Sequence, residues 1–221
     1  MQNTTNAPSY KEGLEQLTGQ LSGMLPEESL KIFDHDARQL QEKHNSPLVI
    51  QVGDKAPSFT LPNATGRLVS SEELLKKGKL VIVFYRGTWC PYCNLQLSTY
   101  QSALDQIKTT GANLIAISPQ TPDQSLSMKE KNQLAFEVLS DAGNTVSRKF
   151  TSIFRNADSA VDALGQLGID FHSYYEDKSG EIAVPAVFVI DSDSEVLLAR
   201  TEGGDYRNRV EPKEILEALS H

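Results

Sequence analysis

The chain has 221 residues, 39% of them apolar and 23% charged, which is enough for one substantial core plus an appendage. The formal net charge of −8 argues against nucleic acids and membranes as partners, because an acidic protein is repelled by phosphate backbones and anionic lipids. No apolar run approaches the roughly 18 residues that a membrane-spanning helix needs.

Residues 1–50 are predicted to form an N-terminal helical extension. Residues 1–8 have neither the basic nor the apolar region of a signal peptide, so we expect a disordered lead and a cytoplasmic protein. Two amphipathic helices follow, and Pro26 with the acids after it begins the second. The apolar stripes are Leu14, Leu17, Leu21 and Met24, then Leu30, Phe33, Ala37 and Leu40. Such stripes usually cover a core; the alternatives are a lid near the site or a contact within a homodimer.

The compact domain is predicted over residues 51–221. It begins with a short hairpin over residues 59–70 and a one- or two-turn helix for which Ser71 is the candidate cap. Residues 80–85 form an apolar, β-branched run typical of a strand buried on both faces. A helix of about eighteen residues, ended by Gly111, and a second buried strand over residues 113–118 complete a right-handed βαβ unit with parallel strands.

The second half of the domain is predicted to alternate again between strands and helices. Thr121 is placed to cap a polar helix that runs to about Gln133. The further predictions are a strand over residues 136–139, a helix over 141–150, an irregular insertion with one short helix over 151–180, a hairpin over 185–200 and a final amphipathic helix over 212–219.

Two cysteines, Cys90 and Cys93, lie where the first buried strand leads into its helix. Cys90 falls near the N-cap and Pro91 at the first helical position. A thiol there faces free backbone N–H groups and the positive end of the helix dipole, which favour its thiolate. Cys93 falls on the core-facing stripe with Leu97 and Tyr100. The spacing therefore predicts an exposed nucleophile at Cys90 and a sheltered partner at Cys93.

Two other interpretations of the cysteine pair are a zinc site and a pair of structural core residues. The chain has only two cysteines, so a four-thiolate zinc site would need a second copy of the protein. The four histidines show no ligand spacing, so we expect no metal. The strand-to-helix placement disfavours two purely structural cysteines. A redox pair that cycles in a reducing compartment is the preferred interpretation.

Four stretches resemble known families. Residues 89–93 resemble the W-C-x-x-C motif of thioredoxin-like proteins, and Val184-Pro185 resembles their cis-proline loop. Residues 53–62 resemble the G-D-x-A-P-x-F-x-L-P opening of peroxiredoxins, and residues 84–87 resemble their F-Y-P entry to the active site. From about residue 50 to 219 the chain thus resembles the alkyl hydroperoxide reductase/thiol-specific antioxidant (peroxiredoxin-like) superfamily, in its C-x-x-C branch.

The resemblance implies an α/β, thioredoxin-like fold with a central mixed β-sheet flanked by helices. It implies a thiol-dependent peroxidase without a cofactor, which reduces hydrogen peroxide or alkyl hydroperoxides through Cys90 and Cys93. Thioredoxin or a similar dithiol is expected to recycle the pair. Aligned on Phe84, Cys93 takes the place of the family's peroxide-attacking cysteine, Cys90 replaces its threonine and Arg86 its proline.

The family's later arginine corresponds to Pro185 here, so the positive charge of the site must come from elsewhere. Arg86, Arg207 and Arg209 are candidates, and the alternative for each is a solvated surface arginine. Which cysteine attacks stays open, since helix position favours Cys90 and the alignment favours Cys93. We take Cys90 as the nucleophile and Cys93 as the resolving residue.

Arg86 and Thr88 complete the predicted catalytic set. The predicted substrate-binding residues are Trp89, Tyr85, Val184 and Pro185. Trp89 either contributes to a docking surface or covers the core. Two rival functions use the same cysteines. One is a thiol–disulfide oxidoreductase acting on protein disulfides, which Pro185 favours and the lack of a carboxylate in residues 81–85 opposes. The other is a non-catalytic redox sensor whose N-terminal helices bind a partner.

Overall fold

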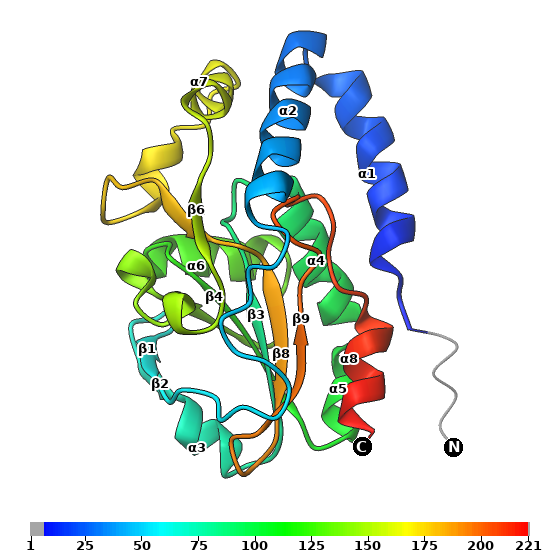
Figure 1. Cartoon of the computed structure of the whole chain (residues 1–221), viewed down its shortest axis with the longest axis vertical. Helices are drawn as coiled ribbons and strands as arrows, with labels where there is room; N and C mark the ends of the chain where they lie inside the picture. Colours follow the sequence, from blue (N-terminus) through cyan, green and yellow to red (C-terminus); the bar gives the residue numbers. More distant parts are fainter. Residues whose placement is uncertain (1–6, 221) are drawn as a thin grey trace.

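The computed structural model describes residues 7–220, so most of the predicted disordered lead lies outside the described residues. A five-stranded mixed sheet in the order β5-β4-β3-β8-β9 forms the centre of the molecule (Figure 1). Strand β3 pairs in parallel with β4 and antiparallel with β8, which confirms the predicted βαβ unit and C-terminal hairpin. The strands are β3 (Leu80–Phe84), β4 (Asn113–Ser118), β5 (Glu137–Ser140), β8 (Ala186–Ile190) and β9 (Val196–Arg200).

The unbroken apolar run of β3 is explained by burial on both faces. Val81 and Val83 enter the core that also holds both cysteines. Leu80, Ile82 and Phe84 enter a second core on the opposite face, beneath the hairpin of β1 (Thr60–Pro62) and β2 (Leu68–Ser70). Because β3 is packed between two cores, the position of its last residue is fixed. The position of the cysteines in the loop and helix that follow is therefore fixed as well.

One face of the sheet is covered by the helix that starts after Cys90 and by the C-terminal helix α8 (Pro212–Leu219). The predicted single helix after the cysteines is wrong in one respect, because it is divided into α4 (Pro91–Ser102) and α5 (Leu104–Thr109). The division lies at Ala103, whose N–H group is shared between the carbonyls of Thr99 and Tyr100. Gly111 ends α5 in the left-handed conformation, with φ of 79°, as predicted.

The N-terminal extension is a helical hairpin of α1 (Tyr10–Met24) and α2 (Glu27–Lys43), as predicted (Figure 1). Helix α1 packs on α4, and α2 packs on α7 (Asp158–Gln166). Helices α1 and α4 lie close together at Gly13, where a Cβ atom would lie 2.7 Å from Leu95 Cδ1. Glu211, the residue before α8, accepts hydrogen bonds from the N–H groups of Tyr10 and Lys11. The start of α1 is therefore attached to the compact domain.

Three local predictions are wrong. Ser70, not Ser71, caps helix α3 (Ser71–Leu75), because the Ser71 hydroxyl is bonded to the backbone of Phe59. Residues 141–150 form short 3-10 turns, since the Asp141 carboxylate accepts the N–H groups that a helix would use. The insertion holds a two-stranded sheet in addition to its helix. This sheet pairs β6 (Ile153–Arg155) with β7 (Glu181–Ala183).

One remaining feature agrees with expectation. Thr121 caps helix α6 (Pro122–Lys131) by accepting a hydrogen bond from the Gln124 N–H group. None of the helices described in residues 7–220 combines the length and the apolar character needed to cross a membrane.

Candidate active site

Cys90 and Cys93 lie at the start of α4, with Cys90 as its N-cap and Pro91 as its first residue. Both cysteines are free, and both side chains are fully buried. The prediction of an exposed Cys90 is therefore wrong. The physical reason is that Trp89 and Tyr92 pack against the core that contains both cysteines. They also pack against a third apolar cluster, which contains Tyr206. The pair thus lies behind an aromatic layer.

The sulfur of Cys93 is surrounded by hydrogen-bond donors. The backbone N–H of Arg86 and the guanidinium Nη2 of Arg209 each lie 3.4 Å from Cys93 Sγ. Burial by itself raises the pKa of Cys93, but the Cys90 thiol, Arg209 and Arg86 together hold that pKa well below its usual range. Cys93 is therefore the residue whose thiolate the site stabilises.

Cys90 has the opposite electrostatic character. Burial raises the pKa of the Cys90 thiol, and its hydrogen bond to Cys93 and the negative charge there raise that pKa further. The guanidinium of Arg86, whose Nη1 lies 3.6 Å from Cys90 Sγ, and that of Arg209 lower the pKa of Cys90 without overcoming these effects. Cys90 thus keeps its proton while Cys93 is ionised. The charges favour Cys93, not the predicted Cys90, as the nucleophile.

Two buried arginines supply the positive charge of the site. Arg86 is 3% exposed and Arg209 is 6% exposed. Within residues 7–220 neither guanidinium forms an ion pair with a carboxylate. A buried cation needs a nearby anion, and the Cys93 thiolate meets that need for Arg209. Arg207, the third candidate, instead pairs with Asp34 and Asp205 on the side of the cavity described below.

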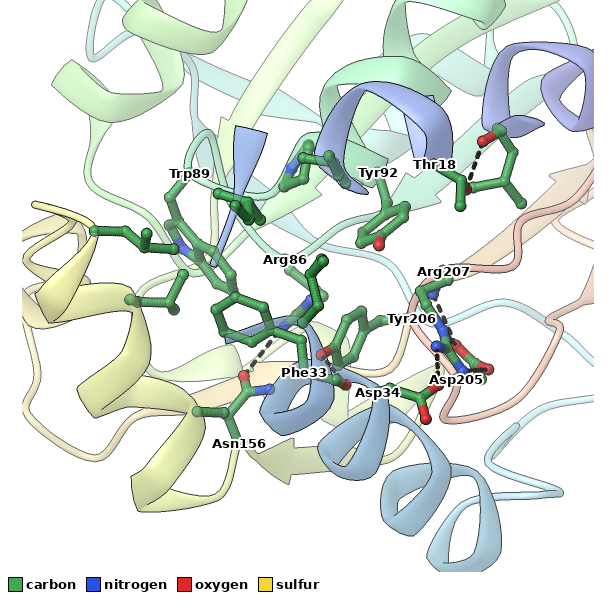
Figure 2. Close-up of a pocket in the computed structure, with 18 of the residues that line it drawn as sticks. Thr18, Phe33, Asp34, Arg86, Trp89, Tyr92, Asn156, Asp205, Tyr206 and Arg207 are labelled. Carbon is green, nitrogen blue, oxygen red and sulfur yellow. Dashed lines mark hydrogen bonds and ion pairs between the residues drawn. The ribbon is translucent and has the colours of Figure 1, made fainter. Parts of the chain in front are cut away.

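Arg86 is held from the N-terminal extension by a chain of hydrogen bonds. Its Nη2 donates to Asn156 Oδ1 at 2.9 Å (Figure 2). Asn156 Nδ2 in turn donates to Asp36 Oδ2 at 2.6 Å. Asp36 is a buried residue of α2 and also accepts the N–H of Ala157. The extension therefore places a negative charge behind Arg86 without touching it directly.

Neither Asp36 nor Asn156 was predicted to be a site residue. Asp36 carried a usable signal, because it lies three residues after Phe33 and four before Leu40, next to the apolar stripe of its helix. A carboxylate there must either face solvent or find a buried partner. Asn156 lies in a loop without any periodic pattern and gave no signal.

Aromatic side chains enclose the Arg86 guanidinium. Its central carbon lies 3.6 Å from the ring centre of Tyr206 and 4.6 Å from that of Trp89. Trp89 Nε1 donates to the Tyr175 hydroxyl at 2.8 Å, and that hydroxyl donates to the carbonyl of Arg86 at 3.1 Å. A Cβ atom on Gly87 would lie 2.5 Å from Trp89 Nε1, so this position requires glycine. Trp89 is thus a fixed wall of the site.

Other predicted site residues lie close in sequence but have different partners. The Thr88 hydroxyl is hydrogen-bonded to Gln120 and to the carbonyl of Gln124, so it anchors the loop before Cys90. Tyr85 is fully buried in the core that holds the cysteines. Neither side chain is presented to a ligand in this arrangement.

The predicted cis-proline loop is wrong, because no cis peptide bond occurs within the described residues. Val184 and Pro185 are buried and connect β7 to β8. The N–H of Val184 donates to Ser152, and the carbonyl of Pro185 accepts from the Thr201 hydroxyl. These backbone groups are therefore not free to bind an extended peptide.

Most of the compact domain is similar in sequence or structure to known proteins. The profile of the AhpC/TSA family matches residues 52–199. A Mycobacterium tuberculosis protein named "Putative peroxiredoxin Rv2521" is 30% identical over 149 residues, which are 67% of this chain and 83% of that protein. Peroxiredoxin Q of rice chloroplasts is 34% identical over 102 residues, 46% of each chain. The crystal structure of peroxidoxin BcpB from M. tuberculosis matches with a TM-score of 0.58 and 22% identity, covering 77% of this chain and 97% of that one.

Proposed function

The chain belongs to the AhpC/TSA family and has its thioredoxin-like fold, and we propose that it reduces hydroperoxides with Cys93 as the attacking thiolate and Cys90 as the resolving thiol. It is a thiol-dependent peroxidase, so its substrates are a peroxide and a reducing thiol. The assignment of roles to residues rests on one observation: two buried arginines without carboxylate partners in residues 7–220 converge on the two sulfurs.

In the first step the Cys93 thiolate attacks one oxygen of the peroxide. A sulfur–oxygen bond forms, the O–O bond breaks, and the other oxygen leaves with the electron pair as hydroxide or alkoxide, which takes up a proton. The guanidinium and backbone N–H of Arg86 and the guanidinium of Arg209 stabilise the negative charge as it moves from sulfur to the leaving oxygen.

In the second step the Cys90 thiol condenses with the sulfenic acid of Cys93. The Cys90–Cys93 disulfide forms and the sulfenic oxygen leaves as water. A thiol that retains its proton until this step does not compete for the peroxide, which suits the raised pKa of Cys90. Thioredoxin or a similar dithiol then reduces the disulfide by exchange, so we place the cycle in the cytoplasm, where such dithiols are kept reduced.

The rival disulfide oxidoreductase is less well supported. It needs a loop that holds an extended peptide, whereas the groups of Val184 and Pro185 are bonded within the chain. The test is peroxide consumption in the presence of thioredoxin, thioredoxin reductase and NADPH, set beside insulin reduction under the same conditions. Rapid NADPH oxidation that needs peroxide and both cysteines supports the proposal. Insulin reduction without peroxide-dependent turnover contradicts it.

A further inference from the structure

A cavity of about 600 Å³ opens beside the cysteine site, between the N-terminal extension and the compact domain (Figure 2). Its walls come from α1, α2, α4, α7 and the loop before α8. Most lining side chains are apolar, among them Leu14, Leu21, Leu30, Phe33, Leu164 and Ile169. This volume and this lining are typical of a site for a small organic molecule.

The shape follows from the packing of α1. At Gly13 the helix lies against Leu95 of α4, and from Leu14 to Ser22 it contributes residues to the wall of the cavity. The stripe predicted to cover the core instead contributes Leu14 and Leu21 to the wall of the cavity, and its last residue, Met24, is exposed. Of the alternatives for this helix, the position near the site is the one that the cavity supports.

Two polar residues of the cavity wall lie next to the cysteine site. Arg86 and Asn156 line the cavity, and Arg86 is the residue whose guanidinium contacts Cys90 Sγ. The other charges on the wall, Asp34, Asp205 and Arg207, are paired with one another. An apolar ligand with a single polar end therefore matches the cavity better than a charged one does.

We propose that this cavity binds the hydrocarbon part of an organic hydroperoxide, with the peroxide group directed toward Arg86. The inference rests on the proposed peroxidase function and names its substrate class: hydroperoxides with a long apolar substituent. Hydrogen peroxide would leave the apolar walls unused. The walls from α1, α2 and the loop at residues 205–208 lie outside residues 52–199, which match the family, so this preference belongs to the added segments of the chain.

The reaction at this site is the one described above, with an alcohol as its product. The terminal oxygen of the hydroperoxide bonds to Cys93, the O–O bond breaks, and the alkoxide takes up a proton. Only the small peroxide group has to pass the layer of Trp89, Tyr92 and Arg86 that covers the sulfurs, while the hydrocarbon stays in the cavity.

The test compares ethyl, butyl, hexyl and octyl hydroperoxide with hydrogen peroxide on the reduced wild-type protein. Full burial of one methylene group corresponds to about a fourfold change in kcat/KM. We expect kcat/KM to rise at least about tenfold from ethyl to octyl hydroperoxide. Leu21→Gln, on the cavity wall, should reduce the octyl-to-ethyl ratio severalfold. Leu17→Gln, on the same helix but not on the wall, is the matched control and should keep that ratio.

A binding measurement separates this inference from the proposed function. Octanol, the unreactive product, should bind the reduced protein and change the fluorescence of Trp89, which lines the cavity. A flat hydroperoxide series with normal turnover of hydrogen peroxide overturns the inference and leaves the proposed function intact. Loss of turnover with every peroxide overturns both. A third outcome is that octanol neither binds nor competes, and that the protein is a dimer which Leu21→Gln dissociates. This outcome assigns the cavity to a contact between two copies of the chain and overturns the inference.

Discussion

Replacing Arg209 tests whether a buried guanidinium maintains the Cys93 thiolate. Nη2 of Arg209 is 3.4 Å from Cys93 Sγ, and both side chains are buried. At that distance the attraction between unit charges is roughly 5 kcal/mol for an effective dielectric constant of about 20, which sets an upper limit. A hydrogen bond to a charged group contributes about 1.5–3 kcal/mol in practice.

Arg209→Met should therefore raise the pKa of Cys93 and lower its rate of reaction with hydrogen peroxide at neutral pH by about 10- to 100-fold. The loss should diminish as the pH rises, because hydroxide then restores the thiolate that the arginine no longer stabilises. Stopped-flow fluorescence of Trp89 over a range of pH measures both effects.

Two further variants make the result specific. Arg209→Lys keeps the charge and should recover part of the rate, whereas a purely structural role would not distinguish lysine from methionine at matched size. Arg200→Met removes an exposed arginine that pairs with Glu214 on the surface and should react like the wild type. An Arg209→Met protein with unchanged rate and unchanged pH profile would refute the reasoning.

Three other predictions follow from the same contacts. Asn156→Ala leaves Arg86 Nη2 and the Asp36 carboxylate without their shared partner, so the free energy of unfolding measured in urea should fall by about 1–3 kcal/mol and the peroxide rate should fall severalfold; an unchanged rate would show that Arg86 needs no such support. Tyr175→Phe removes the acceptor of Trp89 Nε1 and should cost about 1–3 kcal/mol of stability with little change in the pH profile, and a shifted profile would contradict the purely mechanical role. Because the pKa of Cys93 is lowered on folding, the native state binds fewer protons than the unfolded state between that pKa and the ordinary thiol pKa. The stability of the reduced wild type relative to Cys93→Ala should therefore rise with pH across this window in thermal unfolding, and a falling difference would indicate that Cys93 is not the thiolate.

The features that sequence patterns predicted are those set by local chemistry. The run at residues 80–85, the cysteine positions at the helix start and the caps at Thr121 and Gly111 depend on neighbours within one or two turns. These features were enough to predict the fold and to place the two cysteines at the start of the helix.

The features that were missed depend on contacts between distant parts of the chain. Arg209 was one of three candidates for the positive charge, but it is 116 residues from Cys93 and its contact with that sulfur was not predicted. Asp36 is 120 residues from Asn156. Helix position alone favours Cys90, and only the tertiary donors around Cys93 reverse the order of the two pKa values. A sequence records that arginines are present; which one meets the sulfur is decided by packing.

The central claim, that Cys93 attacks and Cys90 resolves, is tested most directly by a single-turnover reaction of each cysteine variant with peroxide. Reduced Cys90→Ser should react rapidly and stop at a sulfenic acid on Cys93, which dimedone traps and mass spectrometry locates. Reduced Cys93→Ser should react no faster than a free thiol. A rapid reaction in Cys93→Ser, with the sulfenic acid on Cys90, would contradict the account.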